Sequence, residues 1–115
     1  WRGGLGVETV IELLDDACLT VRGDRLGGHP PPGTRGGEAG RPGSFSVERA
    51  DGRVEVLAAR QTDVQLAAGD RFVLRTSGGG GLGPARERDA ARVRDDVVSR
   101  KVTPEGAARD YGLDA

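Results

Sequence analysis

Glycine is the residue that most constrains what this chain can fold into. It supplies 20 of the 115 residues, well above the roughly 7% of an average globular protein. Ordering glycine costs more backbone entropy than ordering any other residue, and glycine adds no side chain to a core. We therefore expect a thin core, a fragment of a larger domain, and a chain that is not stable alone.

The glycines are concentrated in two stretches. Eight glycines and four prolines make up 12 of the 21 residues in the segment 23–43, which we expect to be a long loop. Four consecutive glycines, Gly78, Gly79, Gly80 and Gly81, begin a second loop over residues 78–84. These two loops divide the more regular parts of the sequence.

Composition excludes several classes of protein. The 17 basic and 18 acidic residues are interspersed, and aromatic residues make up 3% of the chain, so neither a basic patch nor a set of stacking side chains favours nucleic-acid binding. No run approaches the roughly 18 apolar residues of a membrane span. The first residue is Trp1 and methionine is absent, which predicts a fragment or a processed chain without a signal peptide. The single Cys18 cannot form an internal disulfide and suits the reducing cytoplasm.

The first two expected strands lie before the long loop. Residues 7–14 fit one face of a helix and one face of a strand, and their β-branched content favours the strand. A second strand over residues 18–22 is expected to return antiparallel to the first. In this strand Cys18 is expected to be a buried, unreactive thiol.

Two further strand pairs follow the long loop. Apolar residues alternate over 45–48 and 54–56 around an Asp51-Gly52 turn, which predicts a β-hairpin. Residues 62–66 and 71–76 are expected to form another antiparallel pair, bent at residues 68–70. The expected inward side chains of that pair are Val64, Leu66, Phe72 and Leu74.

The chain changes to helical periodicity after Pro84. Asp89 is a suitable N-cap for a helix over about 90–100, with an apolar stripe that Val98 widens. A second helix is expected from Thr103 as N-cap, with Pro104 in the first position, to about Tyr111. Gly112 suits its left-handed C-cap. The stripe of the first helix consists of Ala90, Val93 and Val97.

The sequence thus predicts an α+β chain that is mainly β, with antiparallel hairpins followed by a short helical hairpin. Its expected divisions are a β-rich part over residues 1–84 and a helical hairpin over 85–115. Charged residues of both signs on the helical hairpin predict a solvated face, with an interface to a partner as the second interpretation.

Few residues offer catalytic chemistry. A metal site needs at least three converging His, Cys, Asp or Glu ligands, and the one histidine, His29, is expected to face solvent on a loop. The four serines lack a recognisable base; they are Ser44, Ser46, Ser77 and Ser99. We assign no catalytic residue and no metal ligand.

The run Gly78 to Gly81 has three interpretations. It can be a linker, a place where backbones pack closely against another chain or domain, or a phosphate-binding loop. A P-loop needs Gly-Lys-Ser/Thr at its end, whereas Gly83 is followed by Pro84 and Ala85. We favour packing and keep the four glycines as weak candidates for cofactor binding.

The order of short motifs resembles the C-terminal end of the hydantoinase B/oxoprolinase family. The motifs are RGGLG at 2–6, a GxxGxPG-like stretch at 37–43, ADG at 50–52, LxxGD at 66–70, TxGGGGxG at 76–83, ERD at 87–89, DV-VS at 96–99 and AARDYG at 107–112. The chain departs from the family pattern at Ser77, Leu82 and Pro84, where proline, an aromatic residue and aspartate are usual.

This resemblance implies ATP-dependent opening of a cyclic amide such as 5-oxoproline or a hydantoin. It implies an A-type partner subunit or domain that handles ATP, and a metal-assisted hydrolytic site in the B-type part, upstream of this segment. The parent complex is thus expected to use ATP and a divalent metal, and this fragment neither. The expected role of the fragment is scaffolding and contact with the A-type subunit and with the upstream part of its own chain. The alternatives are an acetone-carboxylase-like alpha subunit and a non-catalytic β-sandwich binding module.

Overall fold

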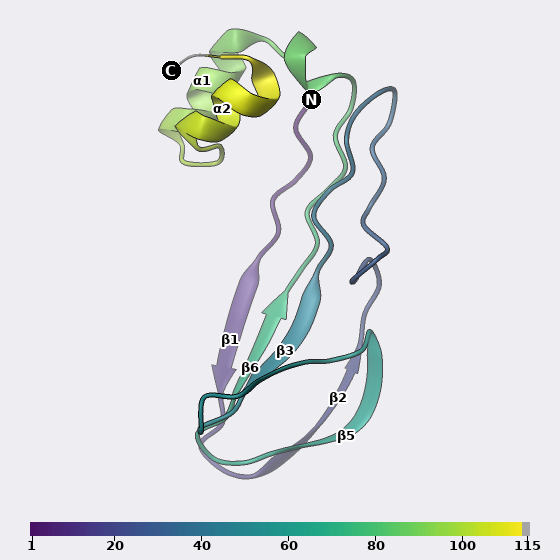
Figure 1. Ribbon diagram of the computed structural model, residues 1–115, viewed down its shortest axis with the longest axis vertical. Coiled ribbons are helices and arrows are strands. Elements are labelled where there is room, and N and C mark those ends of the chain that lie inside the picture. The colour runs from purple at the N-terminus through teal and green to yellow at the C-terminus, as the bar shows by residue number, and fades with distance from the viewer. Residues whose placement is uncertain (114–115) are drawn as a thin grey trace. The chain divides into compact units, whose positions relative to one another are not determined.

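The computed structural model describes residues 1–113, which form six strands, a short 3₁₀-helix and two α-helices. The strands precede the helices along the chain (Figure 1), so the expected mainly β fold with C-terminal helices is confirmed. The chain forms two compact units. The strand unit comprises Gly6–Pro31 and Arg41–Gly78, and the helical unit comprises Trp1–Leu5, Pro32–Gly40 and Gly79–Ala115. The division into residues 1–84 and 85–115 stays a prediction, and the compact units follow different boundaries.

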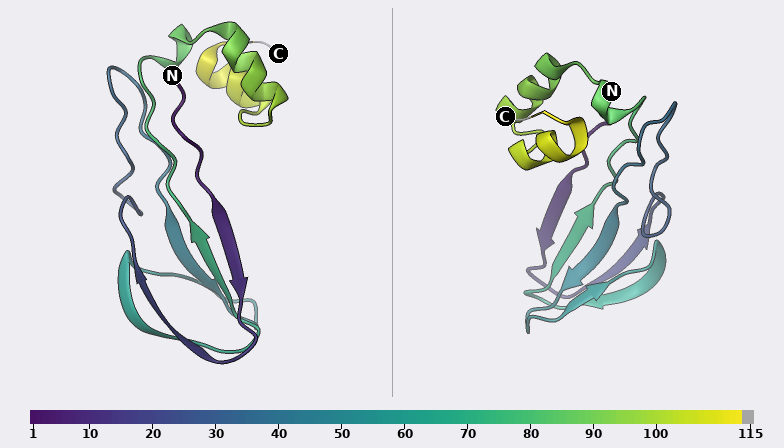
Figure 2. Two further views of the ribbon diagram at one scale, coloured as in Figure 1. Left: turned by 180° about the vertical axis from the view of Figure 1, so that it is seen from behind. Right: turned by 45° about the horizontal axis from the view of Figure 1, so that its top comes forward.

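The larger sheet of the strand unit has four antiparallel strands in the order β1-β6-β3-β4. Their bounds are β1 Glu8–Glu12, β3 Ser44–Glu48, β4 Val54–Val56 and β6 Arg71–Arg75. Strands β3 and β4 form the expected hairpin, in which the Gly52 amide donates to the Arg49 carbonyl at 2.9 Å. Strand β6 lies between β1 and β3 (Figures 1 and 2).

The smaller sheet consists of β2, Ala17–Arg22, paired antiparallel with β5, Arg60–Leu66. The expected pairing of β1 with β2, and of β5 with β6, is therefore wrong. The turns that follow β1 and β5 are corners that lead from one sheet to the other. These corners bond to each other, because the Leu13 amide donates to the Asp70 carbonyl and the Gly69 amide donates to the Leu13 carbonyl, each at 2.8 Å. The alternation of apolar residues indicates which face of a strand is buried, but it does not indicate which other strand pairs with it.

Side chains from both sheets form the core of the strand unit. Phe45 and Phe72 pack with ring centroids 6.0 Å apart, and Val47 is fully buried between neighbours in the larger sheet. The expected inward residues are confirmed. Val64, Leu66 and Phe72 are buried, and Leu74 packs against the same cluster together with Val21, Phe45 and Val47.

The helices of the helical unit begin and end with the expected caps. Helix α1 (Ala90–Val98) is capped by the Asp89 carboxylate, and helix α2 (Pro104–Tyr111) by the Thr103 hydroxyl, which accepts from the Gly106 amide at 3.0 Å. Gly112 ends α2 in the left-handed conformation at φ 68°. Within residues 1–113, no helix has the length and apolar character that crossing a membrane requires.

The apolar stripe of α1 is narrower than expected. Val93 is buried, whereas the side chain of Val98 is 83% exposed and Ala90 is also exposed. The expectation that Val98 widens the stripe is therefore wrong. Buried Asp96, one turn after Val93, takes its place on the inner face.

Candidate functional site

Three extended segments of the helical unit are joined through their backbones. They are residues 1–5, 32–40 and 79–83. The Gly79 amide donates to the Gly4 carbonyl, the Gly81 amide to the Glu38 carbonyl, and the Leu82 amide to the Trp1 carbonyl, each at 2.9 Å. Hydrogen bonds therefore run from the glycine-rich segment at 79–83 to both of the others.

Glycine is required where these segments approach one another. A Cβ atom on Gly80 would lie 1.9 Å from the Pro32 carbonyl oxygen, and one on Gly37 would lie 2.1 Å from the Gly81 carbonyl oxygen. Both distances are far inside van der Waals contact. The favoured interpretation of the glycine run as a close backbone contact thus describes the geometry, although the partner is the same chain and not another chain or domain.

The same hydrogen bonds bear on the candidate phosphate site at Gly78 to Gly81. A phosphate cradle needs backbone N–H groups that are free to point at the ligand. The Gly78 amide donates to the Arg41 carbonyl at 3.0 Å, and the Gly79 and Gly81 amides donate to carbonyls as described. Cofactor binding by these glycines stays a prediction, and this geometry does not fit a nucleotide phosphate.

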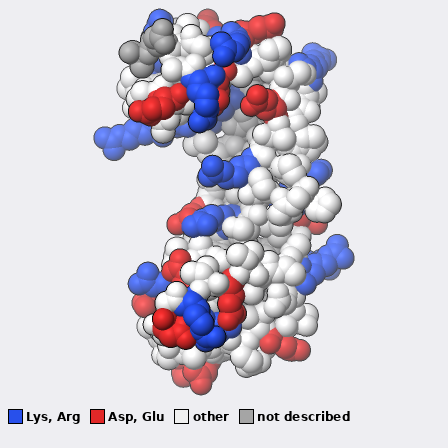
Figure 3. Space-filling view, viewed as in Figure 1, with Lys and Arg blue, Asp and Glu red and all other residues white. Residues whose placement is uncertain are grey.

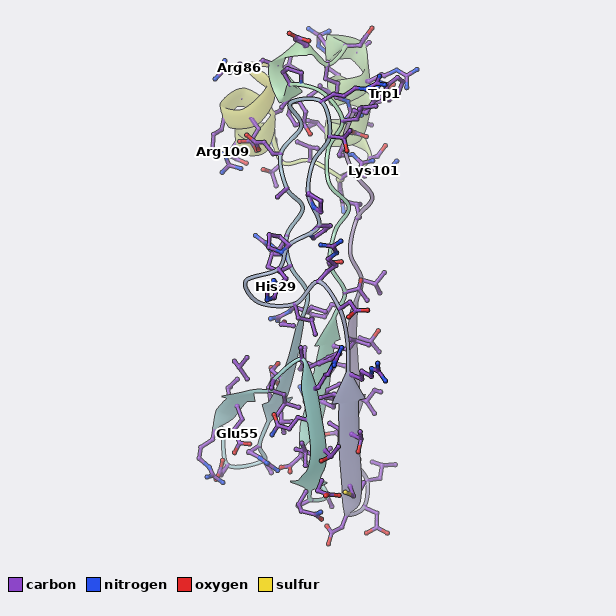
Figure 4. The ribbon with its side chains drawn as sticks, turned by 90° about the vertical axis from the view of Figure 1, so that its right-hand side faces the viewer. Trp1, His29, Glu55, Arg86, Lys101 and Arg109 are labelled. Atoms are coloured by element: carbon purple, nitrogen blue, oxygen red, sulfur yellow. The ribbon has the colours of Figure 1, made fainter. Side chains whose placement is uncertain are left out.

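The donor set does not fit a resident metal ion either. Among residues 1–113 there is no group of three or more His, Cys, Asp or Glu side chains that could hold one. His29 is exposed on a loop (Figure 4). We derive no catalytic step through a metal or a nucleotide for this chain.

Cys18 differs from its expected state. The thiol is exposed, so the expectation of a buried thiol is wrong. The alternation of β2 places Leu19 and Val21 toward the core and Cys18 on the opposite face. Its sulfur accepts a hydrogen bond from Gln65 Nε2 at 3.4 Å, and its thiol donates a long one to Asp63 Oδ1 at 3.8 Å.

Asp96 anchors a buried ion cluster in the helical unit. Its Oδ2 accepts from Arg2 Nε at 3.0 Å and pairs with Arg88 Nη2 at 2.7 Å. Burial alone would raise the pKa of Asp96, but the hydrogen bond from Arg2 and the charges of Arg88, Arg2 and Lys101 outweigh it and lower the pKa. The expected fully solvated face of the helical hairpin is thus wrong at Asp96 and Arg88.

A hollow in the helical unit lies beside this cluster. It has a volume of ≈ 390 Å³ and is lined by Trp1, Arg35, Leu82, Arg88 and Arg92 together with Glu87 and Asp89. The Arg92 guanidinium lies 4.5 Å from the centroid of the Trp1 ring. Three arginines and two carboxylates line the hollow, so its lining carries side chains of both signs. Side chains of both signs are also interspersed over the surface drawn in Figure 3.

A second polar cluster stabilises the turns of the strand unit. Buried Asp70 accepts from the Ala50 and Ala67 amides at 2.9 Å and from Arg49 Nη1 at 3.0 Å. The Ala67 and Ala50 amides, and then the Arg49 guanidinium, lower the pKa of Asp70. Arg49 also bonds Glu55 at 2.8 Å. All three donors to Asp70 lie in the segments that directly follow β3 and β5, so this cluster has a structural role in connecting the two turns.

Sequence reasoning missed Arg49, Asp70, Arg2 and Asp96 as organising residues. Asp70 had a readable signal, since an aspartate after glycine in a bend commonly accepts backbone amides. Arg2 and Asp96 lie 94 positions apart in the chain, and no local pattern connects two such residues.

The chain matches a family model, individual proteins and a solved structure. The family model described as Hydantoinase B/oxoprolinase matches residues 1–85. Protein MJ0963 of Methanocaldococcus jannaschii is 36% identical over 111 residues, which cover 96% of this chain and 19% of that protein. A "Putative D-/L-hydantoinase" B-type subunit of Pseudomonas sp. is 29% identical over 116 residues, which cover 98% of this chain and 19% of that protein.

A solved structure has the same fold over nearly the whole chain. The crystal structure of ATP-dependent caprolactamase from Pseudomonas jessenii matches with a TM-score of 0.74 and 26% sequence identity. The match covers 94% of this chain and 19% of that chain. The chain therefore spans about a fifth of the length of each of these similar proteins.

Proposed function

Because the chain belongs to the hydantoinase B/oxoprolinase family, we propose that it is the C-terminal region of the B-type subunit of an ATP-dependent amidohydrolase that opens cyclic amides. The similarity to the caprolactamase over 94% of the chain carries this proposal. The name of that enzyme specifies a lactam and ATP. 5-Oxoproline and hydantoins also contain a cyclic amide bond. We therefore propose caprolactam, 5-oxoproline and hydantoin as the candidate substrates.

The chemistry explains why such an enzyme needs ATP or a metal. An amide carbonyl is a weak electrophile, and negative charge develops on its oxygen when water attacks. Transfer of a phosphoryl group to that oxygen, or polarisation by a metal ion, stabilises this charge. The residues described in this chain fit neither group, so we assign that chemistry to other parts of the assembly.

The proposed role of this segment is to supply shape and contacts. In the helical unit, backbone hydrogen bonds hold the three extended segments together. The ion pairs of Arg2 and Arg88 with Asp96 connect the N-terminal segment and the segment before α1 to that helix. Such a framework can hold neighbouring parts of a subunit in place without contacting substrate. We propose that its neighbours are the upstream part of the B-type polypeptide and an A-type, ATP-handling subunit, in the cytoplasm.

The test is an assay of lactam-dependent ATP hydrolysis on the intact B-type polypeptide that carries this segment, mixed with its A-type subunit. Caprolactam, 5-oxoproline and hydantoin are supplied separately, and release of the ring-opened acid is measured with phosphate. We expect ATP hydrolysis to depend on one of the three and to produce equal amounts of ring-opened product.

Two controls separate the competing outcomes. The 115-residue chain with the A-type subunit should give no lactam-dependent hydrolysis, and turnover there would contradict the scaffolding role. A second assay supplies acetone and bicarbonate instead. Activity with acetone alone among the substrates would replace the amidohydrolase by a carboxylase.

A further inference from the structure

Strand β1 is an edge strand of the larger sheet and is exposed along its whole length. All five of its residues are exposed, including Val10 at 48% and Ile11 at 50%. One strand further in, Phe72 and Val73 of β6 are buried. β1 lies at the end of the strand order β1-β6-β3-β4 and at the outer edge of the sheet in both views of Figure 2. The loss of burial is therefore confined to the outermost strand on that side.

Among residues 1–113, β6 is the only strand that pairs with β1, so the other backbone edge of β1 is free. The Val7 carbonyl accepts from Thr76, and the Leu13 amide donates to Asp70, so the odd-numbered residues direct their backbone groups toward β6. Because this direction alternates along an antiparallel strand, Glu8, Val10 and Glu12 direct their N–H and C=O groups outward. A row of unpaired groups of this kind is a template for another strand.

The side chains of β1 continue two apolar surfaces that stop short at this edge. Ile11 lies opposite Phe72 and Thr9 opposite Leu74, so both share the face that carries the core. Val10 lies opposite buried Val73 on the other face. A strand added beside β1 would cover Ile11 and Val10 from the side and extend the core by one strand.

We propose that the outer edge of β1 pairs with an extended strand from the part of the B-type polypeptide that this chain does not span, an inference that rests on the proposed function. In the three similar proteins the matching region is 19% of the polypeptide, so most of each protein is available to supply that strand. The added strand presents an apolar residue on the face shared with Ile11, because that face continues into the core.

A second copy of this chain fits the edge less well. Antiparallel pairing of two β1 strands about Val10 would place Glu8 of one copy directly opposite Glu12 of the other, twice in each pair. Like charges directly opposite one another destabilise a sheet. Glu8 pairs with Arg75 and Glu12 with Arg71, both on the adjacent strand β6. Neither glutamate therefore needs a cation from the new strand.

The experiment measures hydrogen exchange on the intact B-type polypeptide, without any substitution. The amides of Thr9 and Ile11, which point toward β6, provide an internal reference. We expect the outward amides of Val10 and Glu12 to exchange as slowly as this reference, within about tenfold. Exchange of the outward amides more than about 100-fold faster than the reference would overturn the proposal, because it would show a free edge.

Substitution provides a second measurement. Val10→Pro removes the outward N–H, and an unpaired edge position tolerates this loss whereas a paired one does not. We expect Val10→Pro to lower the unfolding temperature of the intact polypeptide by at least about 4 °C more than Val10→Ala does. Equal unfolding temperatures for the two variants would contradict the pairing.

Two outcomes distinguish this inference from its alternatives. Protection that disappears when the polypeptide is diluted to a monomer would assign the edge to a second copy and overturn the proposal. The proposed function is tested separately by lactam-dependent ATP hydrolysis. If the polypeptide hydrolyses ATP in response to a lactam but the amides of β1 exchange fast, only the strand-pairing inference is wrong. If those amides are protected but no lactam-dependent hydrolysis occurs, only the proposed function is wrong.

Discussion

The two units of the molecule are stabilised by opposite means. In the strand unit, large side chains from two sheets bury one another around Phe45, Val47 and Phe72. In the helical unit, the three extended segments instead contact one another through backbone atoms. Glycines lie at the closest of these contacts, where a side chain would not fit.

This difference determines which substitutions each unit tolerates. A side-chain core loses stability when a residue becomes smaller, because a cavity remains. A backbone contact loses stability when a residue becomes larger, because two chains must separate. Single substitutions in each unit test that contrast.

Gly80→Ala should be the most damaging single change. The added Cβ would lie 1.9 Å from the Pro32 carbonyl oxygen, a contact with backbone that no rotation of a side chain relieves. We expect destabilisation of about 4 kcal/mol or more, at the upper end for single substitutions. The measurement is hydrogen exchange at Gly79, Gly81 and Leu82, whose amides should lose protection.

The matched control for this change is Gly4→Ala in the same unit. A Cβ on Gly4 meets no atom within 4 Å, so the variant should retain protection at the same three amides. Equal exchange rates in both variants would contradict the claim that close backbone contact stabilises the helical unit.

Val47→Ala tests the opposite rule in the strand unit. Val47 has no exposed surface and lies in the core, so its truncation should cost about 2–3 kcal/mol through lost burial and a residual cavity. Val56→Ala on the neighbouring strand, where the side chain is 79% exposed, should change stability by no more than about 0.5 kcal/mol. Denaturant unfolding of both variants measures the difference, and similar losses would contradict a side-chain core.

The sequence predicts these two units unequally. Strand positions, the hairpin at Gly52 and the helix caps at Asp89 and Thr103 depend on neighbouring residues, so local patterns were sufficient. The pairing of β1 with β6 and of β2 with β5 depends on which corner leads to which sheet. Local alternation contains no information about that choice.

The site was predictable only in part for the same reason. Glycine content indicated close backbone contact, but the partner of Gly80 is Pro32, 48 positions away. Burial of Asp96 runs against the general tendency of charged helix residues to face solvent. It depends on Arg2 and Arg88, which approach it from distant parts of the sequence.

Asp96→Asn tests whether the stability of the helical unit depends on pH, because Asp96 is a buried carboxylate paired with Arg2 and Arg88. The folded state lowers the pKa of Asp96, so its contribution is fully present above the unfolded value of about 3.9 and is lost as the pH falls through the lower folded value. At neutral pH the variant should lose about 1–3 kcal/mol. That deficit should shrink below about pH 4, where the aspartate itself becomes protonated.

The control for this charge effect is the neighbouring Asp95→Asn. Asp95 is exposed and makes no ion pair among residues 1–113. Thermal unfolding of both variants between pH 2 and pH 7 separates the two positions. A deficit of Asp96→Asn that is the same at every pH would show that packing of the side chain, and not its charge, is what matters.

Thr103→Ala should have the smallest effect, and it tests a side chain in the unit that depends on backbone contacts. The Thr103 hydroxyl accepts from the Gly106 amide at the start of α2, and removing an N-cap hydroxyl costs about 1 kcal/mol. Thr103→Ser keeps the hydroxyl and should restore most of that loss. Because α2 is only one part of the helical unit, amides at Gly79 and Gly81 should keep their protection while those of α2 exchange faster. If exchange rose equally at both places, the cap would be coupled to the glycine contacts, and the helical unit would behave as one cooperative structure.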